Sequence, residues 1–268
     1  MNDVLDMLEK DRVLVNFRAK DRDFDLVLDV LPEVDSTNRY MLDEAVRGAM
    51  TGSACLARTQ TAGRGRRGKS WLAPVGNIYL SLLWRFNNSF ESVSGLSLVA
   101  GAAVAELVAS YAVKSVALKW PNDVLCDGKK ICGILVETLI LKEDMWAAVV
   151  GVGLNVRMNE QLGKDITQPW TDLSTGAGRE LCCNEVAGRL LAALVQAIKQ
   201  FERHGLEAVL PRWNQFDILA GREVVATASQ GETRGIAKGI DATGALLIEV
   251  DGVIHRVLSG DVSLRLAL

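Results

Sequence analysis

The sequence predicts an α+β protein in which a large domain of mixed helices and strands precedes a small antiparallel β-barrel. Three observations support this prediction. The chain has 268 residues, which is enough for one large domain and one small one. As far as residue 217, helical patterns alternate with short apolar, β-prone runs. From residue 218 onward, short β-prone runs separated by glycine-containing turns indicate a barrel of about 50 residues.

Hydrophobic spacing sets the expected elements of the large domain. Strands are expected over residues 27–34, 78–84, 116–120, 129–137 and 146–156. Helices are expected over residues 3–10, 95–112, 185–205 and 206–216, the last with a candidate break at Pro211. A further helix begins at Asp35 or Ser36, either of which can cap its first amides, and Asp127-Gly128 fits a type I′ turn. We therefore divide the chain into an N-terminal extension (1–30), a mixed domain (31–217) and a C-terminal barrel (218–268).

Composition narrows the class of protein. The chain is 49% hydrophobic and 24% charged with a formal net charge of −3, which is typical of a globular protein rather than an extended nucleic-acid binder. No apolar run reaches about 18 residues, so we expect no membrane span. The N-terminus is acidic and lacks the order of a secretory signal, and the five cysteines fit no zinc motif. We therefore expect a cytoplasmic protein with reduced thiols and no protein-bound metal.

The most informative segment is the loop 63–70 with Trp71 after it, which places four cations and three glycines in nine residues. The loop also fits the pattern of a phosphate-binding P-loop, G-x-x-x-x-G-K-S. A P-loop needs a helix from its lysine onward, whereas Pro74 and Gly76 follow at once and the next segment is β-prone. We therefore interpret the loop as a flexible clamp for a polyanion, because glycine frees the backbone and arginine pairs with carboxylate or phosphate oxygens.

Five motifs, in order along the chain, resemble those of the biotin–protein ligases. They are Asp35 to Asn38, Gln60 to Gly68 with Trp71, Lys119 to Asp123, Lys130 with Gly133 to Glu137, and Gly151 to Asn155. The resemblance covers residues 31–268 and implies a class II synthetase-like catalytic domain with a mixed sheet and flanking helices, followed by an SH3-like barrel. It implies a monofunctional ligase that uses ATP and Mg²⁺ to convert biotin to biotinyl-5′-AMP, then transfers biotin to a lysine of a biotin carboxyl carrier protein.

The resemblance also implies a role for each matching residue. Residues implied to surround biotin are Ser36, Thr37, Asn38, Gln60, Arg64, Gly65, Arg66, Lys130 and Gly133. Residues implied to contact ATP or the adenylate are Arg64, Arg66, Arg67, Trp71, Lys130 and Asn155. The implied catalytic residues are Lys130, Arg66 and Asp123, the last to orient the incoming amine or act as its base. These types suit the chemistry, because neutral hydrogen-bonding groups match a urea and cations neutralise a carboxylate brought against a triphosphate.

Several of these positions also have structural interpretations. Residues 36–38 suit helix capping, residues 119–120 suit packing at a strand end, and Gly133 suits close approach of two strands. Glu137 is either a solvated or an ion-paired strand residue. These interpretations stay open beside the functional ones.

Two other functions fit parts of the pattern, namely a lipoate–protein ligase and a non-catalytic biotin sensor. Lipoate has no ureido ring for the polar residues 36–38 and Gln60 to bind, and a sensor has no need of Lys130 and Asp123. About 30 residues precede the core, too few for the helix-turn-helix repressor domain of many family members, so we expect no DNA binding. Lys238 stands where some relatives place an arginine near the nucleotide, which puts bidentate binding there in doubt. Pairing into a homodimer is compatible with the family.

Overall fold

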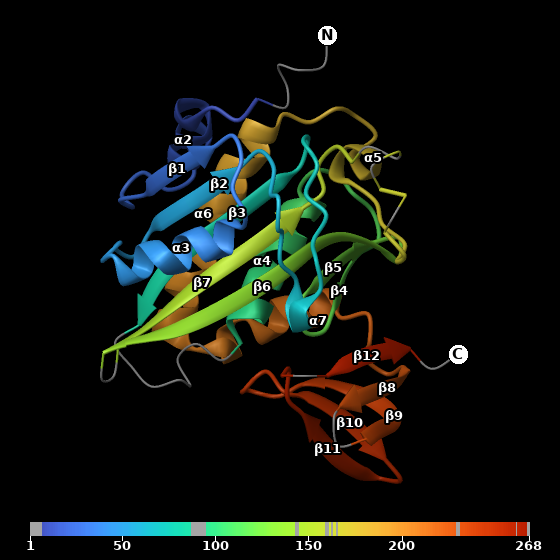
Figure 1. Ribbon diagram of the computed structural model, residues 1–268. Helices are drawn as coiled ribbons and strands as arrows, with labels where there is room; N and C mark the ends of the chain where they lie inside the picture. Colours follow the sequence, from blue (N-terminus) through green and yellow to red (C-terminus); the bar gives the residue numbers. More distant parts are fainter. Residues whose placement is uncertain are drawn as a thin grey trace.

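Two β-sheets organise the protein in a computed structural model, which describes residues 7–86, 95–142, 145–158, 161, 163–164, 166–228, 231–260 and 262–266. Seven strands form a large sheet with helices on both faces, and five strands from the C-terminal part of the chain form a smaller sheet beside it (Figure 1). Among the described residues, no helix is long and apolar enough to cross a membrane.

The large sheet has the strand order β1-β2-β3-β7-β6-β5-β4. Its strands are β1 (Val27–Leu31), β2 (Ser53–Ala57), β3 (Ile78–Phe86), β4 (Val116–Lys119), β5 (Asp123–Cys126), β6 (Lys129–Lys142) and β7 (Met145–Leu154). β1 and β2 pair in parallel and all other neighbours pair antiparallel, so the sheet is mixed, as predicted. Side chains alternate between the two faces along each strand, so the residues that pack against the main helical layer and those that form the site lie on opposite faces.

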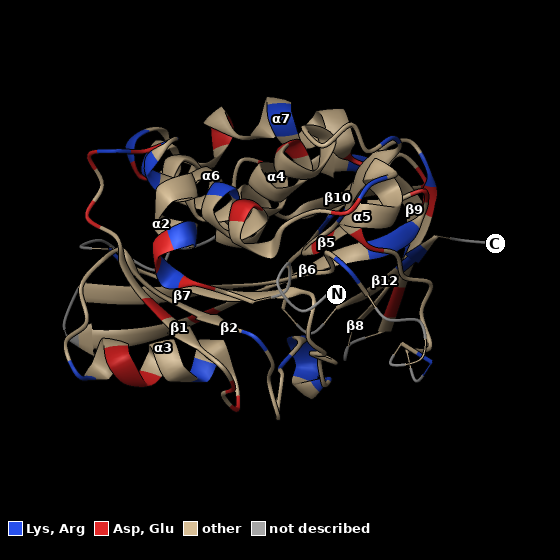
Figure 2. Ribbon diagram, turned by 90° about the horizontal axis from the view of Figure 1, so that it is seen from above, with Lys and Arg blue, Asp and Glu red and all other residues tan. Residues whose placement is uncertain are grey.

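Helices cover the two faces of the large sheet unequally. They are α2 (Lys10–Arg18), α3 (Thr37–Val46), α4 (Leu96–Ala109), α5 (Leu173–Ala177), α6 (Cys183–His204) and α7 (Leu210–Phe216), with 3₁₀ turns η1 (Arg66–Gly68) and η3 (Leu206–Ala208). Figure 2 shows α4, α6 and α7 on one face and α3 on the opposite one. A small separate cluster, which includes Met41 of α3 and Val149 of β7, packs α3 onto its face. The segment 36–38 therefore begins a helix that lies apart from the main helical layer.

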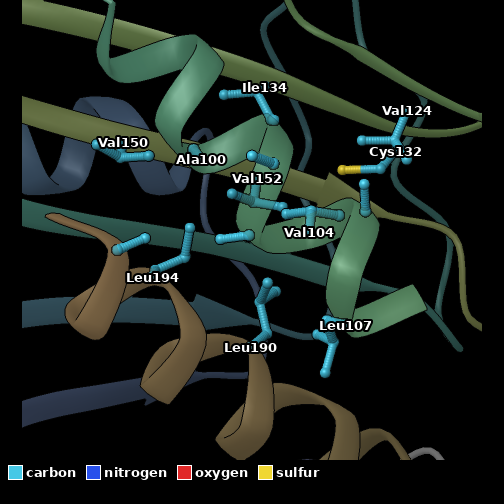
Figure 3. Packing of buried hydrophobic residues seen from close by; sticks show 14 of the residues in the cluster. Ala100, Val104, Leu107, Val124, Cys132, Ile134, Val150, Val152, Leu190 and Leu194 are labelled. Atoms are coloured by element: carbon cyan, nitrogen blue, oxygen red, sulfur yellow. The ribbon is translucent and has the colours of Figure 1, made fainter. Parts of the chain in front are cut away.

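The main hydrophobic core lies between the large sheet and the helices α4 and α6. Figure 3 shows Ala100 and Val104 of α4 against the sheet, where Val152 faces them, while Leu190 and Leu194 of α6 approach from the other side. α4 is buried on nearly all sides, which explains why its sequence is apolar throughout rather than along one stripe. This packing fixes the central strands β7 and β6, whose opposite face carries the candidate site.

The N-terminal helix differs from the sequence-based expectation. Residues 3–6 of the helix predicted at 3–10 lie outside the described residues, and residues 7–9 are not helical. The helix α2 lies further along and buries Val13 and Phe17 in the main core, next to α6. Gly188 permits this contact, because a Cβ there would lie 2.5 Å from the Val13 carbonyl oxygen. The sequence did not predict α2 because the segment is rich in charged residues and only Val13 and Phe17 are buried.

Two helix ends are also shifted. The break expected at Pro211 occurs at Gly205, which has a φ of 69° after α6 ends at His204. Pro211 instead lies in the first turn of α7, where its missing N–H disrupts no helical hydrogen bond. The helix predicted to reach residue 112 ends at Ala109, and Ala112 has a φ of 62°. The predicted turn at Asp127-Gly128 is confirmed, with φ values of 48° and 73°.

The C-terminal residues form an antiparallel sheet of the order β11-β10-β9-β8-β12. Its strands are β8 (Glu223–Ala228), β9 (Gly231–Ile240), β10 (Leu246–Val250), β11 (Val253–Val257) and β12 (Ser263–Leu266). The indole N–H of Trp120 donates to the carbonyl of Gly244 at 3.0 Å, which joins the end of β4 to a turn of this sheet. The predicted strand-rich C-terminal unit is therefore present and contacts the large domain near the site.

Candidate active site

Three glycines on the two central strands form a flat floor on the α3 face of the large sheet. Gly133 of β6 pairs with Gly153 of β7, and Gly151 lies two residues earlier, so all three are on one face. A Cβ at Gly153 would lie 2.6 Å from Cε2 of Trp71, and one at Gly133 would lie 2.8 Å from Cζ3 of the same ring. A Cβ at Gly151 would lie 2.1 Å from Asn38 Oδ1. The glycines thus allow Trp71 and Asn38 to lie directly on the backbone.

Asn38, in the first turn of α3, is hydrogen-bonded to strands on both sides of β7. The hydroxyl of Ser81 on β3 donates to Asn38 Oδ1 at 2.6 Å. Asn38 Nδ2 donates to the Leu135 carbonyl at 3.1 Å and to Glu137 Oε2 at 2.9 Å, both on β6. Ser81 and Leu135 both pair with Gly151, so the amide lies along one row of the sheet. Both amide hydrogens of Asn38 are used by the protein, which leaves its oxygen to accept from a ligand.

Gln60 caps the helix α3 from a neighbouring segment. Its Oε1 accepts from the Thr37 backbone N–H at 2.9 Å and lies 3.2 Å from the Thr37 hydroxyl. Ser36 occupies the N-cap position, but its side chain makes no capping bond, so the capping prediction for Ser36 is wrong. The carboxylate of Asp35 accepts from the adjacent Ser36 N–H at 2.6 Å and forms a 3.6 Å ion pair with Arg39. The buried residues 36–38 and the partly buried Gln60 therefore form a polar group at the start of a helix.

The loop 63–70 folds into a tight hairpin, not into the start of a long helix. Arg64 and Ser70 form a β-bridge, and the Gly65 N–H donates to the Lys69 carbonyl at 2.7 Å. Arg67 lies at the exposed tip with a φ of 58°, within the single turn η1. The strand β3 follows, which confirms that the P-loop interpretation was correctly set aside. The hairpin exposes its arginines at the edge of the glycine floor.

Arg64 and Arg66 extend from this hairpin in two directions. Arg64 forms an ion pair with Glu137 of β6, next to Asn38. Arg66 NH1 donates to Asn122 Oδ1 at 3.2 Å, and its NH2 donates to the backbone carbonyl oxygens of Ser259 and Gly260, the latter at 2.7 Å. Arg66 therefore connects the hairpin to the C-terminal sheet, a contact that no sequence pattern indicates.

Lys130 is the cation at one end of the glycine floor. Its Nζ lies 2.7 Å from Asp123 Oδ1, and the two side chains are only 15% and 22% exposed. The same Nζ lies 5.3 Å from the ring centroid of Trp71, within the range of a cation–π contact. Asp123 pairs with Gly133 in the β5–β6 register, so the ion pair sits at the end of the glycine floor. The indole N–H of Trp71 is buried there and has no hydrogen-bond partner among the described residues.

The segment 169–171 forms the wall beyond Lys130. The Lys130 N–H donates to the Pro169 carbonyl and its carbonyl accepts from the Thr171 N–H, both at 2.9 Å. Asn155 Nδ2 donates to the Thr171 carbonyl at 3.0 Å, which leaves Asn155 Oδ1 for other contacts. Trp170 pairs with Lys130 in a β-bridge and lines the same wall. Sequence reasoning missed Trp170, because this segment has no regular periodicity.

These elements enclose a pocket of about 830 Å³. It is lined by every site residue expected from the sequence, namely Ser36, Thr37, Asn38, Gln60, Arg64, Gly65, Arg66, Arg67, Trp71, Asp123, Lys130, Gly133 and Asn155. One end carries neutral amide and hydroxyl groups, with the Arg64–Glu137 ion pair beside them, and the other carries Lys130 and Asp123. Ser81, Glu137, Asn122 and Trp170 also shape the site, and of these Asn122 and Glu137 stand in motifs named above without an assigned function.

Cysteines contribute no nucleophile to this pocket. Burial raises the pKa of the Cys55 thiol to about 12, and burial likewise raises the pKa of Cys132 above its usual range. Both thiols therefore stay protonated at neutral pH. All five cysteines are free, and only Cys182 is partly exposed, in line with the expectation of reduced, mostly buried thiols.

Comparisons with known proteins agree with this geometry. Residues 30–155 match the Biotin/lipoate A/B protein ligase family, and residues 220–265 match the Biotin protein ligase C terminal domain. The bifunctional ligase/repressor BirA of Escherichia coli is 41% identical over 239 residues, which cover 89% of this chain and 74% of that protein. The biotin–[acetyl-CoA-carboxylase] ligase of Mycobacterium tuberculosis is 36% identical over 242 residues, or 88% of each chain.

A solved structure gives the same result. The biotin protein ligase from Aquifex aeolicus in complex with biotin and ATP superposes with a TM-score of 0.77 at 31% identity, over 90% of this chain and 99% of that one. Fold and pocket thus define an enzyme of the biotin and lipoate ligase class, built on a glycine-floored mixed sheet. Within that class, the chain belongs to the biotin–protein ligases.

Proposed function

We propose that this protein activates biotin with ATP to biotinyl-5′-AMP and transfers the biotinyl group to a lysine of a biotin carboxyl carrier domain. The observation that supports this most strongly is the division of one pocket into a neutral polar end and a cationic end, with Trp71 and the glycine floor between them. A urea matches the neutral end, and a carboxylate next to a phosphate matches the cationic end.

At the neutral end, we assign Ser36, Thr37, Asn38 and Gln60 to the ureido ring. Hydrogen bonds hold the side chains of Thr37, Asn38 and Gln60, so these three keep their geometry without a ligand. Asn38 offers only an acceptor, which suits an N–H of the ureido ring rather than its carbonyl. Lipoate has no N–H in its ring, so this arrangement favours biotin over lipoate.

To the biotin carboxylate and the nearby phosphate we assign Lys130 and Gly133 at the cationic end. We also assign Arg64, Gly65 and Arg66 of the hairpin to them, as groups that would close over the ligand. Lys130 would stabilise the negative charge that builds up when the carboxylate oxygen attacks the α-phosphorus and pyrophosphate leaves. Such positioned cations are the main source of rate enhancement in phosphoryl and nucleotidyl chemistry. The buried indole N–H of Trp71 is a further donor that a bound ligand can satisfy.

For the nucleotide, we assign Arg67, Trp71 and Asn155 as further contacts. ATP would carry Mg²⁺ with it, and the oxygen groups that fit this ion are the Asp123 carboxylate and Asn155 Oδ1. When bound, Mg²⁺ supplies charge neutralisation to the phosphates. Among the described residues, no group of three or more His, Cys, Asp or Glu side chains gathers as a metal site.

In the second half-reaction, the amine of the acceptor lysine attacks the carbonyl carbon of the mixed anhydride, and AMP leaves. We assign Asp123 to orient this amine or to take its proton, because its carboxylate lies beside Lys130 at the pocket. The hairpin 63–70 would cover the anhydride and keep water out until the acceptor arrives. A carrier domain of a carboxylase is the acceptor that the named relatives suggest.

Several finer features also belong to this proposal. We infer a class II synthetase-like arrangement of the large domain, which would span residues 31–217, and an SH3-like closure of the C-terminal sheet over residues 218–268. We further propose a cytoplasmic location, a role without DNA binding, and a homodimer as the assembly to test first.

Pyrophosphate release tests the central assignment. The protein is incubated with MgATP and either biotin or lipoate, and pyrophosphate is followed in a coupled assay. We expect release with biotin and none above background with lipoate. Release with lipoate alone would favour the lipoate–protein ligase alternative, and release with neither would indicate a binding protein without catalysis.

A further inference from the structure

Glu137 lies on β6 at the junction between the neutral end of the pocket and the hairpin. Its Oε2 accepts from Asn38 Nδ2 at 2.9 Å, while its Oε1 forms the ion pair with Arg64. The Glu137 side chain is 21% exposed and that of Arg64 is 43% exposed, so solvent screens the pair only in part. A single carboxylate thus joins a pocket residue from α3 to a residue of the loop.

The first consequence concerns the orientation of the Asn38 amide. The two ends of an amide are distinguished by their hydrogen-bond partners. Ser81 donates to the oxygen end, and the carboxylate of Glu137 accepts from the nitrogen end, next to the Leu135 carbonyl. Because a carboxylate can only accept, Glu137 fixes Asn38 with its oxygen available to the pocket.

The second consequence concerns the position of the hairpin. Its two arms are joined by the Arg64–Ser70 bridge and by the Gly65 to Lys69 hydrogen bond, so the hairpin moves as one piece. Among the described contacts, Arg64 attaches it to β6, and Arg66 attaches it to Asn122 between β4 and β5 and to the loop between β11 and β12. The attachment to β6 is an ion pair, and its strength depends on one carboxylate.

We propose that Glu137 is a positioning residue that holds the hairpin 63–70 over the pocket through Arg64 and so sets how long the adenylate stays bound. Glu137 touches neither substrate nor reacting atoms in this proposal. It acts through Arg64 on the hairpin and through Asn38 on the ureido pocket. The inference rests on the proposed function, because it concerns the lifetime of the intermediate which that function forms.

Two substitutions separate these two contacts. Glu137→Gln keeps an oxygen that can accept from Asn38 but removes the charge that binds Arg64. Glu137→Ala removes both contacts, the one with Asn38 and the one with Arg64. Glu44→Gln is the matched control, because Glu44 forms a comparable ion pair with Arg47 on the same helix as Asn38, away from the pocket. The intermediate is formed with biotin and MgATP, and its release is timed by trapping free adenylate at several NaCl concentrations.

We expect Glu137→Gln to release the adenylate about fivefold faster than wild type, which is the upper end for one partly exposed ion pair. The Kd for biotin alone should stay within about twofold, because Asn38 keeps its partner. Salt should accelerate release from the wild type, since it screens the ion pair, and this acceleration should be absent in Glu137→Gln. Glu137→Ala should show the faster release and also weaker biotin binding. Glu44→Gln should match the wild type in both.

Equal or slower release from Glu137→Gln, with the salt dependence of the wild type, would overturn the inference. So would a faster release that Glu44→Gln shares, since that would reflect general loosening of the fold. Should Glu137→Ala not fold, Glu137→Gln alone decides the result. If wild-type protein formed no adenylate at all, the proposed function would fail instead, so the two failures are distinguishable.

Discussion

Replacing Lys130 by alanine removes the cation that the proposed chemistry depends on. In the structure, its ammonium lies 2.7 Å from Asp123 and over the ring of Trp71, with 15% of the side chain exposed. Removing one such preorganised group costs about 10²- to 10³-fold in rate. We therefore expect Lys130→Ala to lower the rate of adenylate formation by at least about a hundredfold.

The neighbouring carboxylate adds a second effect on substrate binding. A ligand oxygen bound to the ammonium would lie roughly 4.5 Å from the Asp123 carboxylate, if both accept at ordinary hydrogen-bond distances. Without Lys130, two negative charges at that separation repel by up to about 4 kcal/mol at an effective dielectric constant of 20, less solvent screening. Lys130→Ala should therefore also weaken ATP binding, and adding Asp123→Asn should restore part of the binding but none of the rate.

Pyrophosphate release at saturating biotin, with ATP varied, measures both effects as kcat and KM. Lys199→Ala is the matched control, since Lys199 forms a partly buried ion pair with Asp21 far from the pocket. Near-normal kcat in Lys130→Ala would refute the role of this cation. An ATP KM that the added Asp123→Asn leaves unchanged would refute the electrostatic argument for the pair.

Three further outcomes follow from the structure. Gly153→Ala should weaken biotin binding by about tenfold, because the added Cβ would lie 2.6 Å from Trp71 and overpacking costs about 1–3 kcal/mol. Calorimetric titration with biotin measures this loss of affinity. A thiol-reactive maleimide should label Cys182 first in the native protein, since the other cysteines are buried, and uniform labelling by intact mass would contradict this. Burial opposes ionisation of Asp241, but hydrogen bonds within its turn and from Arg256 outweigh it and lower the pKa to about 2. Its stabilisation is present above the unfolded pKa of about 3.9 and is lost towards pH 2, so Asp241→Asn should lower Tm at pH 7 and differ less from wild type as the pH falls through that window.

The fold was largely readable from hydrophobic spacing where segments were long and regular. The long apolar helix, the amphipathic helix after residue 182 and the central strands all appear where the pattern placed them. The helix α2 was missed because only Val13 and Phe17 of its nine residues are buried, too few to give a periodic signal. The short helix α5 was missed for the same reason, since five residues cannot establish a period.

The pocket was predictable as a set of residues but not as a set of contacts. Motifs identified Gly133, Gly151 and Gly153, yet only the cross-strand register shows that they form one floor beneath Trp71 and Asn38. Capping was expected from Asp35 or Ser36, whereas the Thr37 N–H donates to Gln60, 23 residues further along the chain than Thr37. Long-range partners of this kind depend on strand order, which periodicity does not specify.

Side-chain partners of the arginines were the least predictable part of the site. Glu137 was open to two readings, as a solvated residue or an ion-paired one, and the structure shows the pair with Arg64. The contact of Arg66 with two backbone carbonyl oxygens of the C-terminal sheet leaves no trace in sequence, because a carbonyl is present at every residue. Such contacts follow only from how the two sheets pack.

Native mass spectrometry after incubation with biotin and MgATP tests the central claim most directly. The account predicts a complex whose mass exceeds that of the protein by one biotinyl-5′-AMP, and predicts that a carrier domain discharges it. A protein that binds biotin and ATP unchanged, with no adenylate at any time, would contradict the account.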